Sequence, residues 1–272
     1  MPEGHTLHAL AGRLDRAFAG APVTVTSPQG RFAAGAALLD GSVLREASAW
    51  GKHLFAEFDG DAWLHVHLGL IGKFDVVDDP RAPVRGQVRL RLANRHTVAD
   101  LRGPQLCAVV TPDQVTAVQD RLGPDPLRPD AAPDGGAAAV ARSRRTVAEL
   151  LMDQSVLAGV GNVYRCEVLF RHRIDPFRPG RELRPSTWPA LWQDLVTLMP
   201  LGVAAGQILT MTDQVEDALA ELAATGAVTT PERRYHVYKR TGEPCRVCGS
   251  KIRTAVVAGR NLFWCGRCQR RR

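Results

Sequence analysis

Four cysteines near the end of the chain place the strongest constraint on its fold. They form two pairs, Cys245-x2-Cys248 and Cys265-x2-Cys268, separated by sixteen residues. Paired knuckles at this spacing bring four thiolates to the corners of a tetrahedron around Zn²⁺. The spacing therefore predicts one structural Zn²⁺ ion, which would also allow so short a ribbon to fold with little apolar core. No redox or nucleotide cofactor is expected.

Positive charge is concentrated in the same part of the chain. The 272 residues carry a formal net charge of +7, whereas residues 232–272 alone contain 12 Lys and Arg against two Glu, a balance of +10. The remainder of the chain is therefore slightly acidic. A concentrated basic segment favours a polyanionic partner, because each neutralised phosphate releases condensed counterions. A merely solvated basic tail is the alternative, and the cysteines and aromatic residues of the segment disfavour it.

Apolar periodicity predicts a mixed first half of the chain. Residues 4–18 carry an apolar stripe at helical spacing. From about residue 22 to residue 111 the apolar residues alternate and are interrupted by turn signals, which predicts strands. The expected strands are 23–26, 43–47, 53–58, 63–68, 88–92 and 106–110. This pattern predicts an antiparallel sandwich or barrel of about six to eight strands.

The second half of the chain is predicted to be helical. Residues 122–143 are rich in Pro, Gly, Ala and Asp, which predicts a linker at a domain boundary. Beyond them, Thr146 and Glu149 have the spacing of a capping box, and a glycine turn at 159–161 precedes a helix that Asn162 opens. The predicted domains are a β-sandwich domain with an N-terminal helix at 1–118, a helical domain at 122–225 and a zinc ribbon at 232–272.

The longest stretch without charge, between Asp194 and Asp213, is predicted to form two buried helices and not a membrane span. Pro200 and Gly206 interrupt it, and such residues break a continuous apolar helix. The N-terminus lacks a basic region followed by an apolar run, so no secretory signal is expected. These features predict a soluble, cytoplasmic protein with no membrane partner.

Five blocks of sequence resemble the formamidopyrimidine-DNA glycosylase and endonuclease VIII family, in the family's order. They are MPEG at 1–4, WGK at 50–52, HLGLIG at 67–72, DQSVLAGVGNVY at 153–164 and GRNLFWCGRCQ at 259–269. The resemblance implies an α+β fold with an N-terminal antiparallel β-sandwich flanked by helices, a helix–two-turns–helix domain and a C-terminal zinc ribbon. It also implies a monomeric, bifunctional DNA glycosylase and AP lyase of base excision repair, acting on damaged duplex, bubble or single-stranded DNA.

Pro2 is the nucleophile that the resemblance implies. Once Met1 is removed, proline offers a secondary amine, and its attack on a sugar C1′ gives an iminium ion without an added proton. That cation acidifies the C2′ hydrogens, so base excision continues into β,δ-elimination. Glu3 adjoins the nucleophile and is expected to move protons at the sugar oxygen and the departing base. Many chains begin with Met-Pro, so the motif has weight only together with the other blocks.

Two basic residues are assigned to the reaction through the resemblance. Lys52 lies in a turn before a strand, where its ammonium would reach a phosphate or the reacting sugar. Arg260 lies on the ribbon hairpin, where its guanidinium would bind phosphates beside the lesion and assist the second elimination. Most turn lysines are simply solvated, which is the alternative for Lys52.

Four further residues are predicted to contact DNA. Asn162 begins a helix whose free N–H groups suit a phosphate, and simple N-capping is its alternative role. Leu70 and Ile71 lie in a turn and would fill the gap left by an everted base, unless they pack against the second domain. Arg102 is expected to contact the orphaned opposite base.

The substrate is expected to be an oxidised pyrimidine. The segment 224–244 is too short for the long capping loop of the purine-specific branch, and Leu70 occupies a position where that branch usually has methionine. Both features favour the endonuclease VIII branch, although His5 and Gly69 differ from its better-known members. The lesion range and the roles of His5 and His8 stay open.

Other readings of the sequence are possible. A non-catalytic zinc-ribbon DNA-binding protein explains the charge and the cysteines but leaves Pro2, Glu3 and Lys52 as coincidence. An RNA-associated zinc protein is a second alternative. His65 and His67 share one face of a strand and would bind a metal only with a third ligand, which the sequence nearby does not offer.

Overall fold

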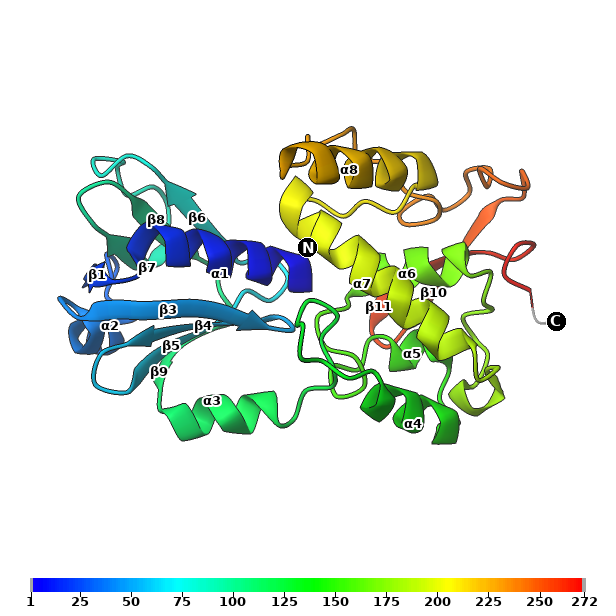
Figure 1. Cartoon of the computed structure of the whole chain (residues 1–272), viewed down its shortest axis with the longest axis horizontal. Helices are drawn as coiled ribbons and strands as arrows, with labels where there is room; N and C mark the ends of the chain where they lie inside the picture. Colours follow the sequence, from blue (N-terminus) through cyan, green and yellow to red (C-terminus); the bar gives the residue numbers. More distant parts are fainter. Residues whose placement is uncertain (1, 271–272) are drawn as a thin grey trace. The chain divides into compact units, whose positions relative to one another are not determined.

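The computed structural model describes residues 2–270, and Met1, whose removal the nucleophile hypothesis requires, lies outside them. The chain divides into two compact units between Arg121 and Leu122. Figure 1 shows the strands of the first unit and the mainly helical second unit. Each unit has its own buried core.

The first unit contains two antiparallel sheets and three helices. One sheet has the order β1-β3-β4-β5-β9 and the other β2-β7-β8-β6. The strands are β1 (Ala21–Pro22), β2 (Thr24–Thr26), β3 (Val43–Trp50), β4 (His53–Phe58), β5 (Ala62–His67), β6 (Lys73–Val77), β7 (Val88–Ala93), β8 (Val98–Arg102) and β9 (Leu106–Val110), and the helices are α1 (Gly4–Phe18), α2 (Ala33–Leu39) and α3 (Pro112–Gln119).

The apolar stripe of α1 explains how this unit is held together. Its members Leu7, Leu10, Leu14 and Phe18 are buried in one cluster with apolar residues from both sheets. Asp15 accepts a hydrogen bond from the backbone N–H of Ala47 at 3.0 Å, which ties the helix to β3. The cluster supplies the hydrophobic stabilisation of the unit.

The second unit begins with a segment that the sequence analysis assigned to a linker, and part of that assignment is wrong. Residues Asp134–Arg142 form the helix α4. Val140 is buried in the core, and the indole N–H of Trp188 donates to the carbonyl of Pro133 at 3.0 Å. The alanines of 137–141 favour a helix once tertiary contacts bury one of its faces.

Helices α5 (Val147–Leu150) and α6 (Asn162–Arg171) flank the two turns of the predicted motif. The capping box at Thr146 and Glu149 is confirmed. Gln154 spans the turns, because its side-chain amide donates to the carbonyl of Val160 at 3.0 Å and accepts from the N–H of Gly159 at 3.1 Å. Gly159 has φ +84, a conformation that favours glycine.

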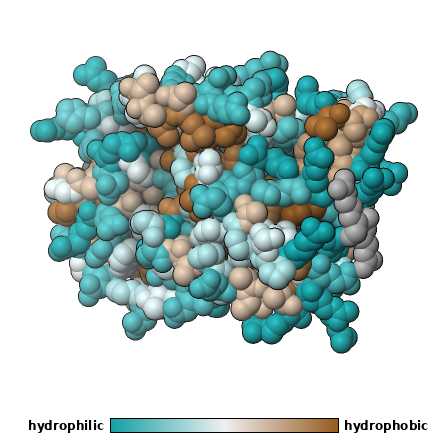
Figure 2. Space-filling model, turned by 45° about the vertical axis from the view of Figure 1, so that its right-hand side comes forward, coloured by the Kyte–Doolittle hydropathy of each residue, from teal (hydrophilic) through white to brown (hydrophobic). Residues whose placement is uncertain are grey.

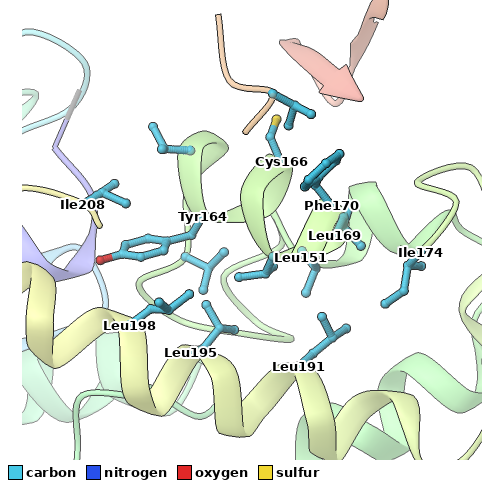
Figure 3. Packing of buried hydrophobic residues seen from close by; sticks show 14 of the residues in the cluster. Leu151, Tyr164, Cys166, Leu169, Phe170, Ile174, Leu191, Leu195, Leu198 and Ile208 are labelled. Carbon is cyan, nitrogen blue, oxygen red and sulfur yellow. The ribbon is translucent and has the colours of Figure 1, made fainter. Parts of the chain in front are cut away.

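The prediction of two helices within the uncharged stretch is wrong in part. The stretch contains the second half of α7 (Thr187–Ala205), with Pro200 inside the helix, and α8 (Thr212–Thr225) begins only at its end. Gly206 ends α7 in the left-handed conformation, as a break at this position requires. Figure 3 shows Leu191, Leu195 and Leu198 of α7 facing Tyr164 and other apolar side chains. No described helix is long and apolar enough to cross a membrane.

The ribbon consists of β10 (Ile252–Val257) and β11 (Arg260–Cys265). Its residues Ile252, Leu262 and Phe263 are buried in the same cluster as α6 and α7. The second unit therefore has one continuous core, and the assignment of 232–272 as a separate domain stays a prediction. The α+β class, with a sandwich, a helix–two-turns–helix element and a ribbon, is confirmed.

Candidate functional site

One end of the first unit collects all of its predicted site residues. Asp15 of α1 contacts Ala47 of β3, and Ala19, which follows α1, contacts Leu44. The helix and the strand therefore run in opposite directions, and the start of α1 lies near the end of β3. Lys52 follows β3 directly. Since His53 pairs with His67, β5 ends at this edge too. The turn at 68–72 and the loop at 103–105 join the two sheets there.

Pro2 and Glu3 lie immediately before α1. Pro2 is half-buried, and Glu3 is fully buried and forms the N-cap with an extended backbone. The side chain of Glu3 makes no capping hydrogen bond to α1, so N-capping does not account for its burial. Removing a carboxylate from water costs free energy. Buried ionisable groups are concentrated at functional sites, so the burial of Glu3 beside Pro2 suits a functional role.

Lys52 occupies the second position of a two-residue hairpin turn. Gly51 precedes it with φ +58, and Trp50 pairs with His53 across the turn. A glycine at the first turn position is typical of a tight type II′ hairpin. The turn presents Lys52 half-exposed at the edge of the sheet.

The sequence analysis missed His53, which lies beside His65 and His67. His53 Nδ1 is 2.9 Å from His65 Nε2, and the rings of His53 and His67 are 5.0 Å apart. Burial, reinforced by the neighbouring rings, lowers the pKa of His53 to about 3 and that of His65 to about 4. Both rings are therefore neutral at pH 7. The hairpin register that pairs residue 53 with residue 67 is the signal that would have revealed this cluster.

His67 has a defined tautomer at neutral pH. Its Nδ1 accepts the backbone N–H of Gly69 at 3.2 Å, and burial lowers the pKa of the ring. A neutral ring that accepts at Nδ1 carries its proton on Nε2. His67 thus offers a donor at the same edge as Lys52.

Leu70 and Ile71 are exposed, as the wedge hypothesis requires. Their exposed fractions are 53% and 81%. The turn that carries them is tightly built, since the N–H of Gly72 donates to the carbonyl of Leu68 at 3.1 Å. A β-carbon on Gly72 would lie only 2.2 Å from that carbonyl oxygen, so the turn needs glycine there.

Arg102 has intramolecular partners that the sequence did not reveal. Its guanidinium donates to Asp75 at 2.8 Å, to Asp100 at 2.7 Å and to the carbonyl of Arg85 at 2.8 Å. Asp100 is also held by Arg91. A contact between Arg102 and an orphaned base would therefore compete with bonds that already fix the side chain, and this contact stays a prediction.

In the second unit, Asn162 connects α6 to the ribbon hairpin. Its side chain is buried and donates from Nδ2 to the carbonyl of Asn261 at 2.9 Å. The N-cap of α6 is Gly161, so the N-capping alternative for Asn162 is wrong. A phosphate contact at this helix end stays a prediction, and it would use the backbone N–H groups.

A fully buried arginine, also missed by the sequence analysis, reinforces this connection. Arg165 donates to the side-chain oxygen of Asn162 and, at 3.1 Å, to the carbonyl of Val257. Val257 and Asn261 flank the hairpin turn that carries Arg260. Together Asn162 and Arg165 hold both strands of the hairpin directly beside Arg260.

Arg260 follows a turn of two residues with positive φ, Ala258 and Gly259. Its guanidinium makes a hydrogen bond to the carbonyl of Gly259 at 3.1 Å, and the side chain is half-exposed. A guanidinium on a fixed hairpin tip suits bidentate contact with a phosphate.

The four cysteines of the ribbon form a cluster that fits a metal ion. Their sulfur atoms all lie within 4.8 Å of one another, and Cys248 and Cys265 are 3.4 Å apart while Cys245 and Cys268 are 3.9 Å apart. Tetrahedral Zn–S bonds of about 2.3 Å require sulfur separations of about 3.8 Å. Across residues 2–270 no other group of His, Cys, Asp and Glu side chains brings its ligand atoms as close together.

Comparison with known proteins places these features in one family. Residues 1–106 match the formamidopyrimidine-DNA glycosylase N-terminal domain, residues 122–214 its H2TH domain, and residues 242–271 the zinc finger found in FPG and IleRS.

Individual relatives cover nearly the whole chain. Endonuclease 8 1 of Mycobacterium tuberculosis H37Rv is 52% identical over 99% of this chain and 100% of its own length. The structure of the MutM (Fpg) protein of Thermus thermophilus is 29% identical, with a TM-score of 0.77 and 98% coverage of both chains. Lactococcus lactis Fpg, solved with abasic-site DNA, shares the fold at 22% identity, with a TM-score of 0.80 over 99% of this chain and 100% of that one. The chain belongs to the formamidopyrimidine-DNA glycosylase and endonuclease VIII family and is a base-excision-repair DNA glycosylase with AP lyase activity.

Proposed function

We propose that the chain excises oxidised pyrimidines through an imine between Pro2 and DNA. The observation that carries this proposal is the position of Pro2 immediately before α1, beside the fully buried carboxylate of Glu3. The positive end of the helix disfavours protonation of a neighbouring amine, whose pKa is ordinarily about 8. More of the imino group is then unprotonated and nucleophilic at neutral pH.

The reaction follows from the chemistry of a secondary amine. The Pro2 nitrogen forms a bond to C1′ while the glycosidic bond breaks and the base leaves with a proton. The nitrogen then loses its own proton, and its electron pair breaks the bond between C1′ and O4′ while O4′ takes up a proton, which opens the sugar and forms the iminium. The iminium draws electrons from C2′, so loss of a C2′ proton expels the 3′ phosphate. Loss of a C4′ proton then expels the 5′ phosphate, and hydrolysis of the imine frees Pro2. Lys52 and Arg260 would bind the phosphates that carry the departing charge.

The endonuclease VIII branch is the substrate assignment that the residues favour. The exposed Leu70 stands where the purine-specific branch usually has methionine, and α8 is followed by a short segment before the ribbon. The 52% identical relative is named endonuclease 8. Damaged DNA is the partner, Asn162, Leu70, Ile71 and Arg102 are its proposed contacts, and a structural Zn²⁺ would hold the ribbon through its four cysteines.

Borohydride trapping tests the proposal against a protein that only binds DNA. The mature protein, with its N-terminal residue identified by mass spectrometry, is incubated with DNA containing an oxidised pyrimidine or an abasic site. Reduction of the imine should join protein and DNA covalently. If the protein binds the damaged DNA but never becomes cross-linked, the proposed imine between Pro2 and DNA is wrong.

Glu3→Gln should slow base excision by about 10²- to 10⁴-fold, the usual contribution of general acid–base catalysis. Cleavage of DNA that already contains an abasic site should be affected less, because no base has to leave. Single-turnover rates on the two substrates measure the difference. The control is Glu46→Gln on the exposed part of β3. Equal rates for Glu3→Gln and the wild type on the base-containing substrate would remove Glu3 from the mechanism.

Arg260→Ala should weaken DNA binding and shift the products from δ- to β-elimination. Without this guanidinium one fewer phosphate is neutralised, so the slope of log affinity against log salt should also decrease by about 0.9. Gel separation of the two products and binding titrations at several salt concentrations measure both effects. Arg253→Ala, an exposed arginine elsewhere on the hairpin, serves as the control, and an unchanged product ratio for Arg260→Ala contradicts the assignment.

A further inference from the structure

The carboxyl-terminal end of α6 opens onto a cavity with an excess of positive charge. The cavity has a volume of about 250 Å³. Its ionisable lining residues are His172, Arg173, Asp175, Arg178, Arg184 and Arg270. Four guanidiniums therefore face one carboxylate, a balance of +3 when the histidine is counted as neutral. Figure 2 shows that hydrophilic side chains cover much of one face of the molecule.

Much of the positive charge of the cavity comes from arginines that form no ion pair with a described carboxylate. Within residues 2–270, no ion pair joins Arg173, Arg184 or Arg270 to a carboxylate. The last residues of α6 behave differently, because Arg171 binds Asp194 at 2.8 Å and His172 contacts the same carboxylate at 3.1 Å. Arg171 already supplies the favourable charge at the helix end. Arg173, Arg184 and Arg270 are therefore not needed to balance the charge at the end of α6.

The backbone conformation of Arg173 also indicates that its side chain has a function. It follows the C-cap residue His172 with φ 53, the left-handed conformation in which helices ordinarily place glycine. A side chain is disfavoured in this conformation. An arginine at a position that suits glycine is therefore a candidate for function through its side chain.

We propose that this cavity binds phosphate groups. The planar guanidinium fork matches a phosphate in bidentate geometry, and a balance of +3 is better matched by an oligophosphate or a nucleic-acid backbone than by a single carboxylate. An adjoining hollow of about 310 Å³ shares His172 and Arg173, but Cys268 lines it. Four thiolates around Zn²⁺ carry a charge of −2, which would repel an anion there. The arginine-lined cavity is thus the binding site.

This site is distinct from the phosphate contacts proposed for the lesion. Those contacts lie at the start of α6, at Asn162, and on the hairpin that Asn162 holds. The ten residues of α6 separate the two ends by about 14 Å. The phosphates would come either from nucleic acid beyond the damaged nucleotide or from a free oligophosphate.

Arg173→Gly separates binding from folding. Glycine suits the left-handed conformation, so the melting temperature should stay the same or rise, while affinity for tripolyphosphate, measured by titration calorimetry, should fall at least about tenfold. The double variant Arg184→Gln, Arg270→Gln should give a similar loss. Arg142→Gln, an exposed arginine at the end of α4, is the control and should bind as the wild type does.

Undamaged duplexes of 12 and 40 base pairs identify the source of the phosphate. Nucleic acid is the source if the salt slope for the longer duplex falls by about 0.9 for each phosphate that a variant no longer neutralises, and a free oligophosphate is the source if only tripolyphosphate binding changes. Both results support the site. The proposal is overturned if the Arg173 and double variants bind both probes as the wild type does, or if polyglutamate binds the cavity and tripolyphosphate does not.

Discussion

Pro2→Gly should lose most borohydride trapping while the protein remains folded. Glycine keeps a terminal amine, but a primary amine gives a neutral imine that must gain a proton before it can acidify C2′. We expect a loss on the order of 10²-fold or more, smaller than the roughly 10⁶-fold cost of removing a nucleophile outright. Pro2 precedes α1 and lies outside the apolar cluster of the first unit, so the melting temperature should change little.

Single-turnover trapping on abasic DNA measures this loss. Pro80→Gly makes the same chemical change in an exposed turn between β6 and β7 and should trap at the wild-type rate. Mass spectrometry must show that Met1 is absent from both variants, because a retained methionine would acylate the residue 2 nitrogen. Equal trapping by Pro2→Gly and the wild type would reject Pro2 as the nucleophile.

The features that the sequence predicted well are those in which chemistry requires particular residues at short spacing. The cysteine knuckles place their sulfur atoms together through local turns, and the N–H of Gly249 donates to the carbonyl of Cys245 at 2.9 Å. The capping box at Thr146 and the helix beginning at Asn162 are local as well. In each case a few consecutive residues determine the geometry.

The features that the sequence analysis missed depend on partners far away in the chain. Arg165 and Glu167 are charged residues that a helical pattern assigns to solvent, yet both are fully buried. Glu167 accepts backbone N–H groups at residues 236, 237 and 238, and Arg165 donates to the carbonyl of Val257. Their burial is favourable only because those backbone groups from distant segments satisfy them.

The missed strand β8 has the same explanation. Its sequence, VADLR, contains a buried aspartate that breaks an alternating pattern, whereas the missed strand β6, KFDVV, does alternate exposed and buried residues and could have been predicted. In the folded chain, Asp100 of β8 is paired with Arg91 of β7 at 2.7 Å. Arg91 on the neighbouring strand thus neutralises Asp100, whose charge makes a strand unfavourable when the segment is considered alone.

Cys265→Ser should release the Zn²⁺ and unfold the ribbon. Structural Zn²⁺ contributes an apparent binding free energy of about 10–16 kcal/mol in zinc-finger peptides, and a serine hydroxyl is a poor substitute for a thiolate. Zinc retention should decrease as the pH falls, because protons then compete for the thiolates.

The expected damage is confined to one unit, because the two units have separate cores. Leu262 and Phe263 of the ribbon are buried with α6 and α7, whereas the first unit has its own cluster. Calorimetry of Cys265→Ser should therefore show a destabilised second unit, a nearly unchanged first unit and loss of DNA binding. Cys107→Ser, on β9 of the first unit, should keep one Zn²⁺ per chain. If metal analysis also finds one Zn²⁺ per chain in Cys265→Ser, the ligand set is wrong, since three thiolates and a hydroxyl would not hold the ion at this affinity.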